Sequence, residues 1–461
     1  MGKKYDMYID YERSYRRRKR LRKNRTGMVI LIIILILVLG TAVVLFFRDR
    51  IDIFKEKVTI KQSDQDNIWS SSENEAPDIT PVVTTQPTIT DAAAPTQEPT
   101  LTPTITPAPV VTTPAAAVSG DGVLWEDNRT PAKVKGIYVT ASAAGTKKLS
   151  SLVSLVETSE LNAMVIDVKG DEGKISYRME SPLAKEIEAT TNTISDMANL
   201  VKTLKDKNIY LIARIVAFKD PYLAEKRQDL AIKNKDGSLF RDNNGEGWVN
   251  PYKQEIWEYL VEVAAQAAAL GFDEIQFDYI RFSTGKGISD ADFGEEAENK
   301  SKEDIITEFT KYACEQLKPL GVFVSADVYG TIINSSVDAA LVGQNYVEMA
   351  KYLDYICPMI YPSHFGEGNY GIQYPDLEPY NIIQKVLTAS KEKLAQLPED
   401  EHKAIVRPWL QDFTATWIKK HQKYGADELR EQMEGVYSVG YDEWILWNAS
   451  NNYTEEGLLR K

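Results

Sequence analysis

Eight short runs rich in β-branched and aromatic residues recur between residues 134 and 447, and segments with helical periodicity separate them. The runs cover residues 136–140, 163–168, 210–216, 274–278, 322–327, 355–361, 404–410 and 443–447. The segments with apolar residues three to four positions apart cover residues 150–159, 194–207, 254–270, 303–317, 346–352, 380–395 and 426–439. No tight hairpin joins two of the runs, so we expect parallel strands.

This alternation predicts an α/β fold, a closed (β/α)8 TIM barrel. An open doubly wound sheet is the alternative. Only residues 454–461 follow the eighth run, so the last helix is expected to be very short or missing. Two connections are longer than the others, 218–252 and 283–302, and in a barrel they would lie on the face that carries active sites.

The N-terminal region has a different composition. Residues 28–47 form an uninterrupted apolar run of the length that crosses a bilayer as a helix. We expect an uncleaved anchor, because a cleaved signal peptide has a shorter apolar region and a small-residue cleavage site. Residues 1–27 form a basic tail, which the positive-inside rule places in the cytoplasm. The protein is therefore predicted to be a single-pass protein of the cell membrane, with all that follows residue 48 outside.

Charge is also unevenly distributed. Residues 1–50 hold thirteen Lys and Arg against four Asp and Glu, and the whole chain has a net charge of −13, so the rest carries about −22. Such an acidic region is a poor match for nucleic acid or an anionic lipid surface. No nucleic-acid partner is expected, and the expected membrane contact is made by residues 28–47. A signalling role for the basic tail is a weaker alternative.

A linker is expected over residues 48–120, where Thr-Pro pairs such as Thr102-Pro103 and Thr106-Pro107 recur and aromatic residues are scarce. This bias favours extended polyproline II segments that cannot bury a core. The linker would let the barrel, expected over residues 121–461, act at a distance from the membrane.

Polar side chains gather at the carboxyl ends of the predicted strands, which a barrel brings to one mouth. Carboxylates from separate strands surrounded by aromatic residues fit glycoside hydrolysis, which needs one carboxylic acid and one carboxylate. Asp278 and Asp327 are the predicted catalytic pair. Asp278 could instead form only a salt bridge to Arg281 or Arg214, and Asp327 could be a hydrogen-bonded strand cap.

Thirteen further residues are predicted to bind substrate or to support the pair. They are Asp167, Lys169, Arg214, Trp248, Arg281, Tyr329, Tyr361, His364, Arg407, Trp409, Asp412, Trp447 and Asn448. Arg214 and Arg407 are interpreted as charge partners that hold a nucleophile ionised, and Arg281 is expected to keep Asp278 ionised and in place. The tryptophans are either sugar platforms or core residues.

Other chemistries lack their motifs. The three histidines form no H-x-x-H or H-E-x-x-H pair, and no Gly-x-Ser-x-Gly elbow or phosphate loop occurs. We therefore expect neither a metal site nor a cofactor. Cys314 and Cys357 are interpreted as buried thiols, with a disulfide between them as the alternative.

Four segments carry a resemblance to a known family. They are Asn250-Pro251, Gly271–Phe282 with its Phe-Asp-Tyr-Ile-Arg-Phe core, Ser325–Gly330 and Pro358–Ser363. Over residues 135–453 the chain resembles a bacterial family of glycoside hydrolase (β/α)8 barrels that is distantly similar to the α-amylase-type clan. The resemblance implies a nucleophile at Asp278, an acid/base at Asp327 and a third acidic residue at Asp412. It departs from the clan at Asp327, where the clan usually has Glu.

The function expected from these features is a membrane-anchored hydrolase of a cell-wall or other extracellular polysaccharide. The alternative is a non-catalytic carbohydrate-binding barrel or wall-associated scaffold. The sugar, the linkage and the oligomeric state have no signature in the sequence.

Overall fold

The structure is a computed structural model that describes residues 127–461. The expected tail, membrane-spanning run and linker lie outside the described residues, as do residues 121–126 of the expected barrel domain. Within residues 127–461, no helix combines the length and the apolar character needed to cross a membrane.

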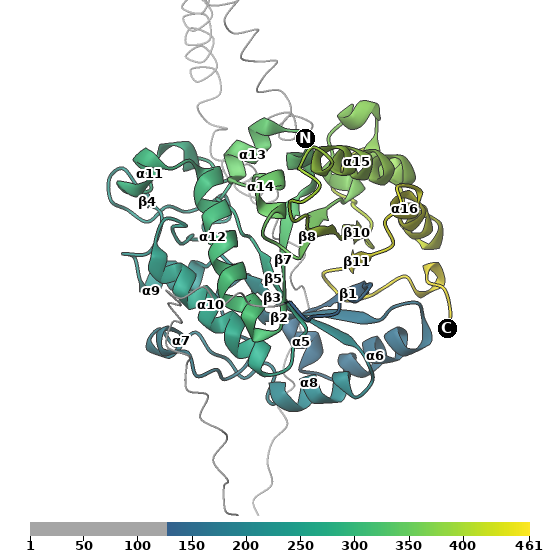
Figure 1. The fold of residues 1–461 in the computed structure, drawn as a ribbon, viewed down its shortest axis with the longest axis horizontal. Coiled ribbons are helices and arrows are strands. Elements are labelled where there is room, and N and C mark those ends of the chain that lie inside the picture. The colour runs from purple at the N-terminus through teal and green to yellow at the C-terminus, as the bar shows by residue number, and fades with distance from the viewer. Residues whose placement is uncertain (1–126) are drawn as a thin grey trace, which may run out of the picture. The chain divides into compact units, whose positions relative to one another are not determined.

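Eight parallel strands form a closed barrel, which confirms the predicted architecture and rules out the open sheet (Figure 1). The first six are β1 Lys135–Val139, β2 Ala163–Lys169, β3 Tyr210–Val216, β5 Glu274–Asp278, β7 Phe323–Tyr329 and β8 Tyr355–Met359. The seventh strand is divided into β9 Ile405–Val406 and β10 Trp409–Gln411, and the eighth is β11 Trp444–Trp447. The barrel closes because β10 pairs with both β8 and β11.

The seventh strand is interrupted at Arg407-Pro408. Proline has no N–H, so Pro408 cannot donate to the ladder. Its carbonyl still accepts from the N–H of Ile445 at 3.0 Å. The break was not predicted, since residues 404–410 read as one continuous run.

The helices cover the outside of the barrel (Figure 1). Each of the seven predicted helices is present, as α6 Lys148–Thr158, α8 Met197–Lys205, α10 Gln254–Ala269, α12 Lys302–Leu317, α14 Tyr346–Ala350, α15 Pro379–Leu394 and α16 Ala426–Ser438. Five short helices were not predicted: α5 Ala141–Ala144, α7 Pro182–Glu186, α9 Pro221–Lys226, α11 Glu296–Asn299 and α13 Ser336–Val342. As expected, no full helix follows β11, and residues 455–457 form only a 3-10 turn.

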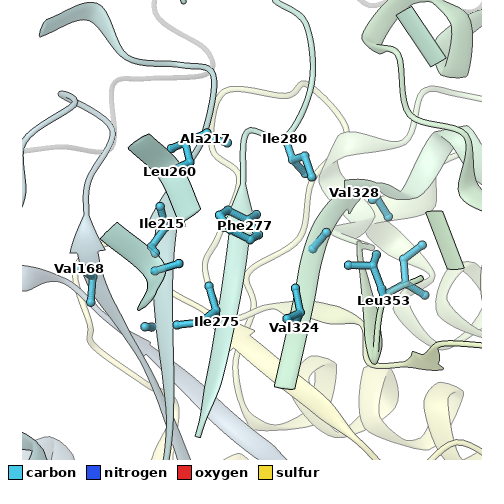
Figure 2. Packing of buried hydrophobic residues seen from close by; sticks show 14 of the residues in the cluster. Val168, Ile215, Ala217, Leu260, Ile275, Phe277, Ile280, Val324, Val328 and Leu353 are labelled. Carbon is cyan, nitrogen blue, oxygen red and sulfur yellow. The ribbon is translucent and has the colours of Figure 1, made fainter. Parts of the chain in front are cut away.

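Strand β5 shows how the two faces differ. Ile275 and Phe277 point outward and belong to the same hydrophobic cluster as Leu260 of α10 (Figure 2). Successive side chains alternate across a strand, so Glu274, Gln276 and Asp278 point into the barrel, where all three are buried. The outer layer thus supplies most of the hydrophobic core, while the interior is available for polar groups.

The two long connections pair with each other. Strand β4 Lys233–Asn234 of the first is antiparallel to β6 Ala291–Asp292 of the second. Asn250 Nδ2 adds a hydrogen bond to Phe293 O at 2.8 Å. The connections follow the carboxyl ends of β3 and β5, so together they build up one side of the barrel mouth.

Candidate active site

Arg214 of β3 is the electrostatic centre of the mouth. It is 1% exposed and contacts three carboxylates. Its Nε and Nη2 donate to Asp278 Oδ2 at 3.0 and 2.7 Å, Nη1 donates to Asp167 Oδ1 at 2.7 Å, and Nη2 donates to Asp171 Oδ1 at 2.8 Å. The ion pair between Arg214 and Asp278 agrees with the expected role of this arginine as a charge partner.

Asp278 and Asp327 lie side by side on neighbouring strands. Phe277 of β5 pairs with Ala326 of β7, so the next residue of each strand occupies the adjacent position. Neighbouring strands are about 4.8 Å apart, and both side chains point into the barrel. The sequence-predicted pair is therefore brought together at one level of the mouth.

The backbone after Asp278 takes an unusual turn. Tyr279 has φ +47°, a left-handed conformation that costs a residue with a Cβ roughly 1–2 kcal/mol. The turn lets the N–H of Tyr279 donate to Asp278 Oδ1 at 2.6 Å. Both carboxylate oxygens of Asp278 thus have donors, one from Tyr279 and one from Arg214.

Asp327 lies in a different environment. It is 2% exposed, and its Oδ1 accepts a hydrogen bond from Trp409 Nε1 at 2.6 Å. Burial raises the pKa of Asp327 well above its ordinary value, and the negative charge of Asp278 raises it further, whereas the hydrogen bond from Trp409 acts to lower it. Asp327 therefore holds its proton more strongly than an ordinary aspartate does.

Asp167 is also a partner of Arg214 and accepts a hydrogen bond from Tyr138 Oη at 2.6 Å. Burial raises the pKa of Asp167, although Arg214 and Tyr138 act to lower it. Asp171 is affected in the opposite direction: burial acts to raise its pKa, but Arg214 and Lys219 hold it below its ordinary value. Arg214 thus binds two carboxyl groups, Asp167 and Asp171, whose pKa values are shifted in opposite directions.

Aromatic side chains surround these acids. Trp447 stacks on Tyr138 with ring centroids 4.2 Å apart and meets Trp409 edge-on at 5.7 Å. A second group joins Tyr361, His364, Phe413 and Trp417, of which Trp417 is 40% exposed. Burial lowers the pKa of His364 to about 4, so its ring is neutral near pH 7. These rings provide flat apolar surfaces of the kind that sugars pack against.

Arg407 does not lie at the mouth, contrary to prediction. It is fully buried and pairs with Glu274 at 2.9 Å and Glu443 at 2.9 Å. Its guanidinium lies 3.7 Å from the ring centroid of Tyr355. Glu274 and Tyr355 begin their strands, and Glu443 precedes β11, so this cluster fills the opposite end of the barrel. Arg407 therefore supports the barrel base and does not hold Asp278.

Three other predicted site residues are engaged in local structure. Lys169 pairs with Asp220 at 2.8 Å and donates to Val216 O. Both oxygens of Asp412 accept hydrogen bonds from Thr454, at 2.6 and 2.9 Å. Asn448 Nδ2 donates to the backbone carbonyls of Asp412 and Asn452. These contacts order the strand ends. Asp412 directly follows β10, at the end of strand seven where it was predicted, and its role as a third acid stays a prediction.

Trp248, Arg281 and Tyr329 form a separate corner of the mouth. Trp248 is 2% exposed and donates to Asp242 Oδ2 at 2.9 Å, so its ring is packed and is not an open sugar platform. The guanidinium of Arg281 faces the rings of Trp248 and Tyr329 at 5.0 and 4.7 Å. The expectation that Arg281 holds Asp278 was wrong, because Arg214 occupies that position.

Sequence reasoning gave no role to Tyr138, Lys219 or Trp417. Tyr138 lies inside the first strand, where nothing distinguishes a core tyrosine from one that bonds a carboxylate. Lys219 and Trp417 follow strands three and seven, so proximity to a strand end could have identified them.

Cys314 and Cys357 are buried free thiols. Among residues 127–461, no group of three or more His, Cys, Asp or Glu is arranged to hold a metal ion.

The chain matches a known protein family and is similar to solved structures. The family model described as "Putative glycosyl hydrolase domain" matches residues 136–453. No curated protein matches the chain. A hypothetical protein from Ruminiclostridium thermocellum is 41% identical over 42% of this chain and 97% of its own, with a TM-score of 0.39. The PgaB (BpsB) glycoside hydrolase domain from Bordetella bronchiseptica is 13% identical over 70% of this chain and 97% of its own, with a TM-score of 0.51. At this low sequence identity, the similarity to the PgaB (BpsB) domain shows a shared fold only.

Proposed function

Since this chain belongs to the glycosyl hydrolase domain family that matches residues 136–453, we propose that it hydrolyses glycosidic bonds of a polysaccharide through Asp278 and Asp327. The observation that carries this proposal is the contrast between two adjacent carboxyl groups. Asp278 is ion-paired with Arg214, whereas burial and the charge of Asp278 raise the pKa of Asp327. Such opposed environments divide the roles of acid and base between two like residues.

In the proposed reaction, Asp327 gives its proton to the glycosidic oxygen as the bond from that oxygen to the anomeric carbon breaks. Asp278, as the carboxylate, either takes a proton from the water that attacks the anomeric carbon or attacks that carbon itself. In the second case, water that gives its proton to Asp327 then attacks the anomeric carbon, breaks the bond to Asp278 and restores both carboxyl groups. Arg214 pairs with Asp278 and orients it, and Trp409 orients Asp327. Asp167, Tyr361, Trp447 and the exposed Trp417 are the proposed sugar contacts, through hydroxyl hydrogen bonds and ring packing.

The proposed location follows from the N-terminal region. Residues 28–47 would anchor the chain in the cell membrane, and the linker would hold the barrel outside. The substrate would then be a cell-wall or extracellular polysaccharide. Protease treatment of intact cells tests this: the barrel should be degraded while the basic tail is protected, and a protected barrel would contradict the proposal.

The catalytic proposal is tested by incubating the full-length protein with purified wall glycans and a panel of α- and β-linked oligosaccharides. Asp278→Asn and Asp327→Asn should each lower product release by at least about a hundredfold. Asp442→Asn, which changes an exposed carboxylate before β11 at the opposite end of the barrel, is the matched control and should retain activity. If the wild type binds a glycan but releases no product from any substrate, the barrel is a binding module and the proposal fails.

A further inference from the structure

Arg281 is a buried cation without an acidic partner in the part of the chain that the structure describes. It is 6% exposed, and its one hydrogen bond within residues 127–461 runs from Nη1 to Phe282 O at 2.9 Å. A guanidinium carries five N–H donors, and leaving a buried charge unpaired is costly. The other buried arginines of the mouth and base, Arg214 and Arg407, each pair with at least two carboxylates.

The carboxylate of Asp278 does not pair with Arg281. Asp278 Oδ2 accepts two hydrogen bonds from Arg214, and Asp278 Oδ1 accepts the N–H of Tyr279. Lys219, the other cation close to Tyr279, already pairs with Glu246 at 3.1 Å. Arg281 therefore differs from Arg214 and Lys219 in having no carboxylate partner within residues 127–461.

Three aromatic rings hold the guanidinium in place. Its Cζ lies 4.7, 4.9 and 5.0 Å from the ring centroids of Tyr329, Tyr279 and Trp248. Cation–π contacts of this kind stabilise the charge but leave the N–H donors unused. No N–H group of Arg281 is among the fully buried side-chain atoms without a hydrogen-bond partner, so its unused donors are accessible to solvent.

We propose that Arg281 binds an oxyanion, a carboxylate or a phosphate, carried by a sugar next to the one that is cleaved. The guanidinium fork matches either oxyanion with two parallel hydrogen bonds. Arg281 is three residues beyond Asp278, and Tyr329 is two residues beyond Asp327, so the corner adjoins both catalytic positions. The inference rests on the proposed function and narrows its substrate class to anionic polysaccharides.

The test measures binding by isothermal titration calorimetry with the full-length protein carrying Asp327→Asn, which prevents turnover. Three oligosaccharides of equal length are compared: one neutral, one with a uronic-acid carboxylate and one with a phosphate monoester. At least one of the two anionic oligosaccharides should bind more tightly than the neutral one. Whichever of the two binds more tightly shows whether Arg281 recognises a carboxylate or a phosphate. Arg281→Gln should weaken its binding by about tenfold to a hundredfold and leave neutral binding unchanged. Arg281→Lys should retain part of the preference, and Arg460→Gln, which removes an exposed arginine far along the chain, should change nothing.

Equal affinity for all three oligosaccharides would overturn the inference, as would an equal loss for all three in Arg281→Gln. If Arg281→Gln fails to fold in a thermal unfolding control, the comparison of the three glycans and its salt dependence still decide the matter. Cleavage of neutral glycans by the wild-type protein without an anionic preference would leave the hydrolase proposal standing and refute this one. Anionic glycans that bind through Arg281 but are never cleaved would support the anion site and refute the hydrolase proposal.

Discussion

Asp278 and Asp327 carry the same functional group in different surroundings. Arg214 and the N–H of Tyr279 satisfy the oxygens of Asp278, whereas Asp327 has burial, a neighbouring negative charge and one donor from Trp409. The residue type at position 327 is shorter by one methylene than the glutamate usual in the clan that the sequence resembles. The proposed acid role of Asp327 depends on the environment of its carboxyl group, in which burial and the charge of Asp278 raise the pKa.

Protonation of Asp327 should make stability and activity depend on pH. Its folded-state pKa is raised, so its contribution to stability is full below the ordinary aspartate pKa and is lost as pH rises through the folded pKa. Asp327→Asn should therefore be more stable than the wild type near neutral pH and equally stable at low pH. Urea unfolding at a series of pH values measures the difference. A variant less stable at neutral pH would contradict the raised pKa.

Loss of Arg214 should be severe, because it would leave three carboxylates close together without their cation. Arg214→Met is expected to lower the free energy of unfolding by about 3–5 kcal/mol near pH 7, with a smaller loss at low pH where the acids are protonated. Denaturant unfolding at both pH values tests this. Arg227→Met, at a partly exposed arginine with surface partners, is the comparison and should cost much less.

At the scale of elements, strand β10 connects the barrel frame to the site. Pro408 ends the pairing of β9, and the chain resumes at Trp409, whose indole donates to Asp327. Arg407, on the other side of Pro408, pairs at the barrel base. One strand thus contributes to both ends of the interior, and the single residue Pro408 separates the two roles.

Trp409→Phe keeps an aromatic ring in the core but removes the donor to Asp327. Because this hydrogen bond acts to lower the pKa of Asp327, its removal should raise that pKa further. The alkaline limb of the pH–activity profile should then move to higher pH, and the acidic limb should stay in place. A profile measured on the best substrate tests this. An alkaline limb that stays in place would show that Asp327 is not the titrating acid.

At the scale of the whole molecule, the C-terminal segment takes the place of an eighth helix. The N–H of Glu160 donates to Leu459 O at 2.8 Å, Lys461 Nζ donates to Val156 O and Leu161 O, and Leu458 is buried. These contacts fasten the end of the chain to α6 and the turn after it. Residues 455–461, which contain only a 3-10 turn, therefore pack on this side of the barrel without forming a full helix.

Deleting residues 455–461 should destabilise the barrel without altering its chemistry directly. The deletion exposes the surface that Leu458 covers and leaves Glu160 without the N–H of Leu459, so we expect a loss of at least about 2 kcal/mol. Thermal unfolding of the full-length and shortened proteins measures it. Leu459→Ser, at a residue that is 58% exposed, is the control and should have little effect.

The sequence by itself determined the barrel. Eight runs of residues with strand propensity, separated by helical periodicity, predicted the eight barrel strands and the seven main helices, because these patterns reflect local propensity and one-sided burial. The short strands β4 and β6 of the long connections were not predicted. The sequence also brought Asp278 and Asp327 to adjacent strands of one mouth. Only the tertiary structure decided which charges pair. Arg214 rather than Arg281 holds Asp278, and Arg407 serves the base, because side-chain reach and strand register, which are set by closure of the barrel, select among carboxylates that look alike in sequence.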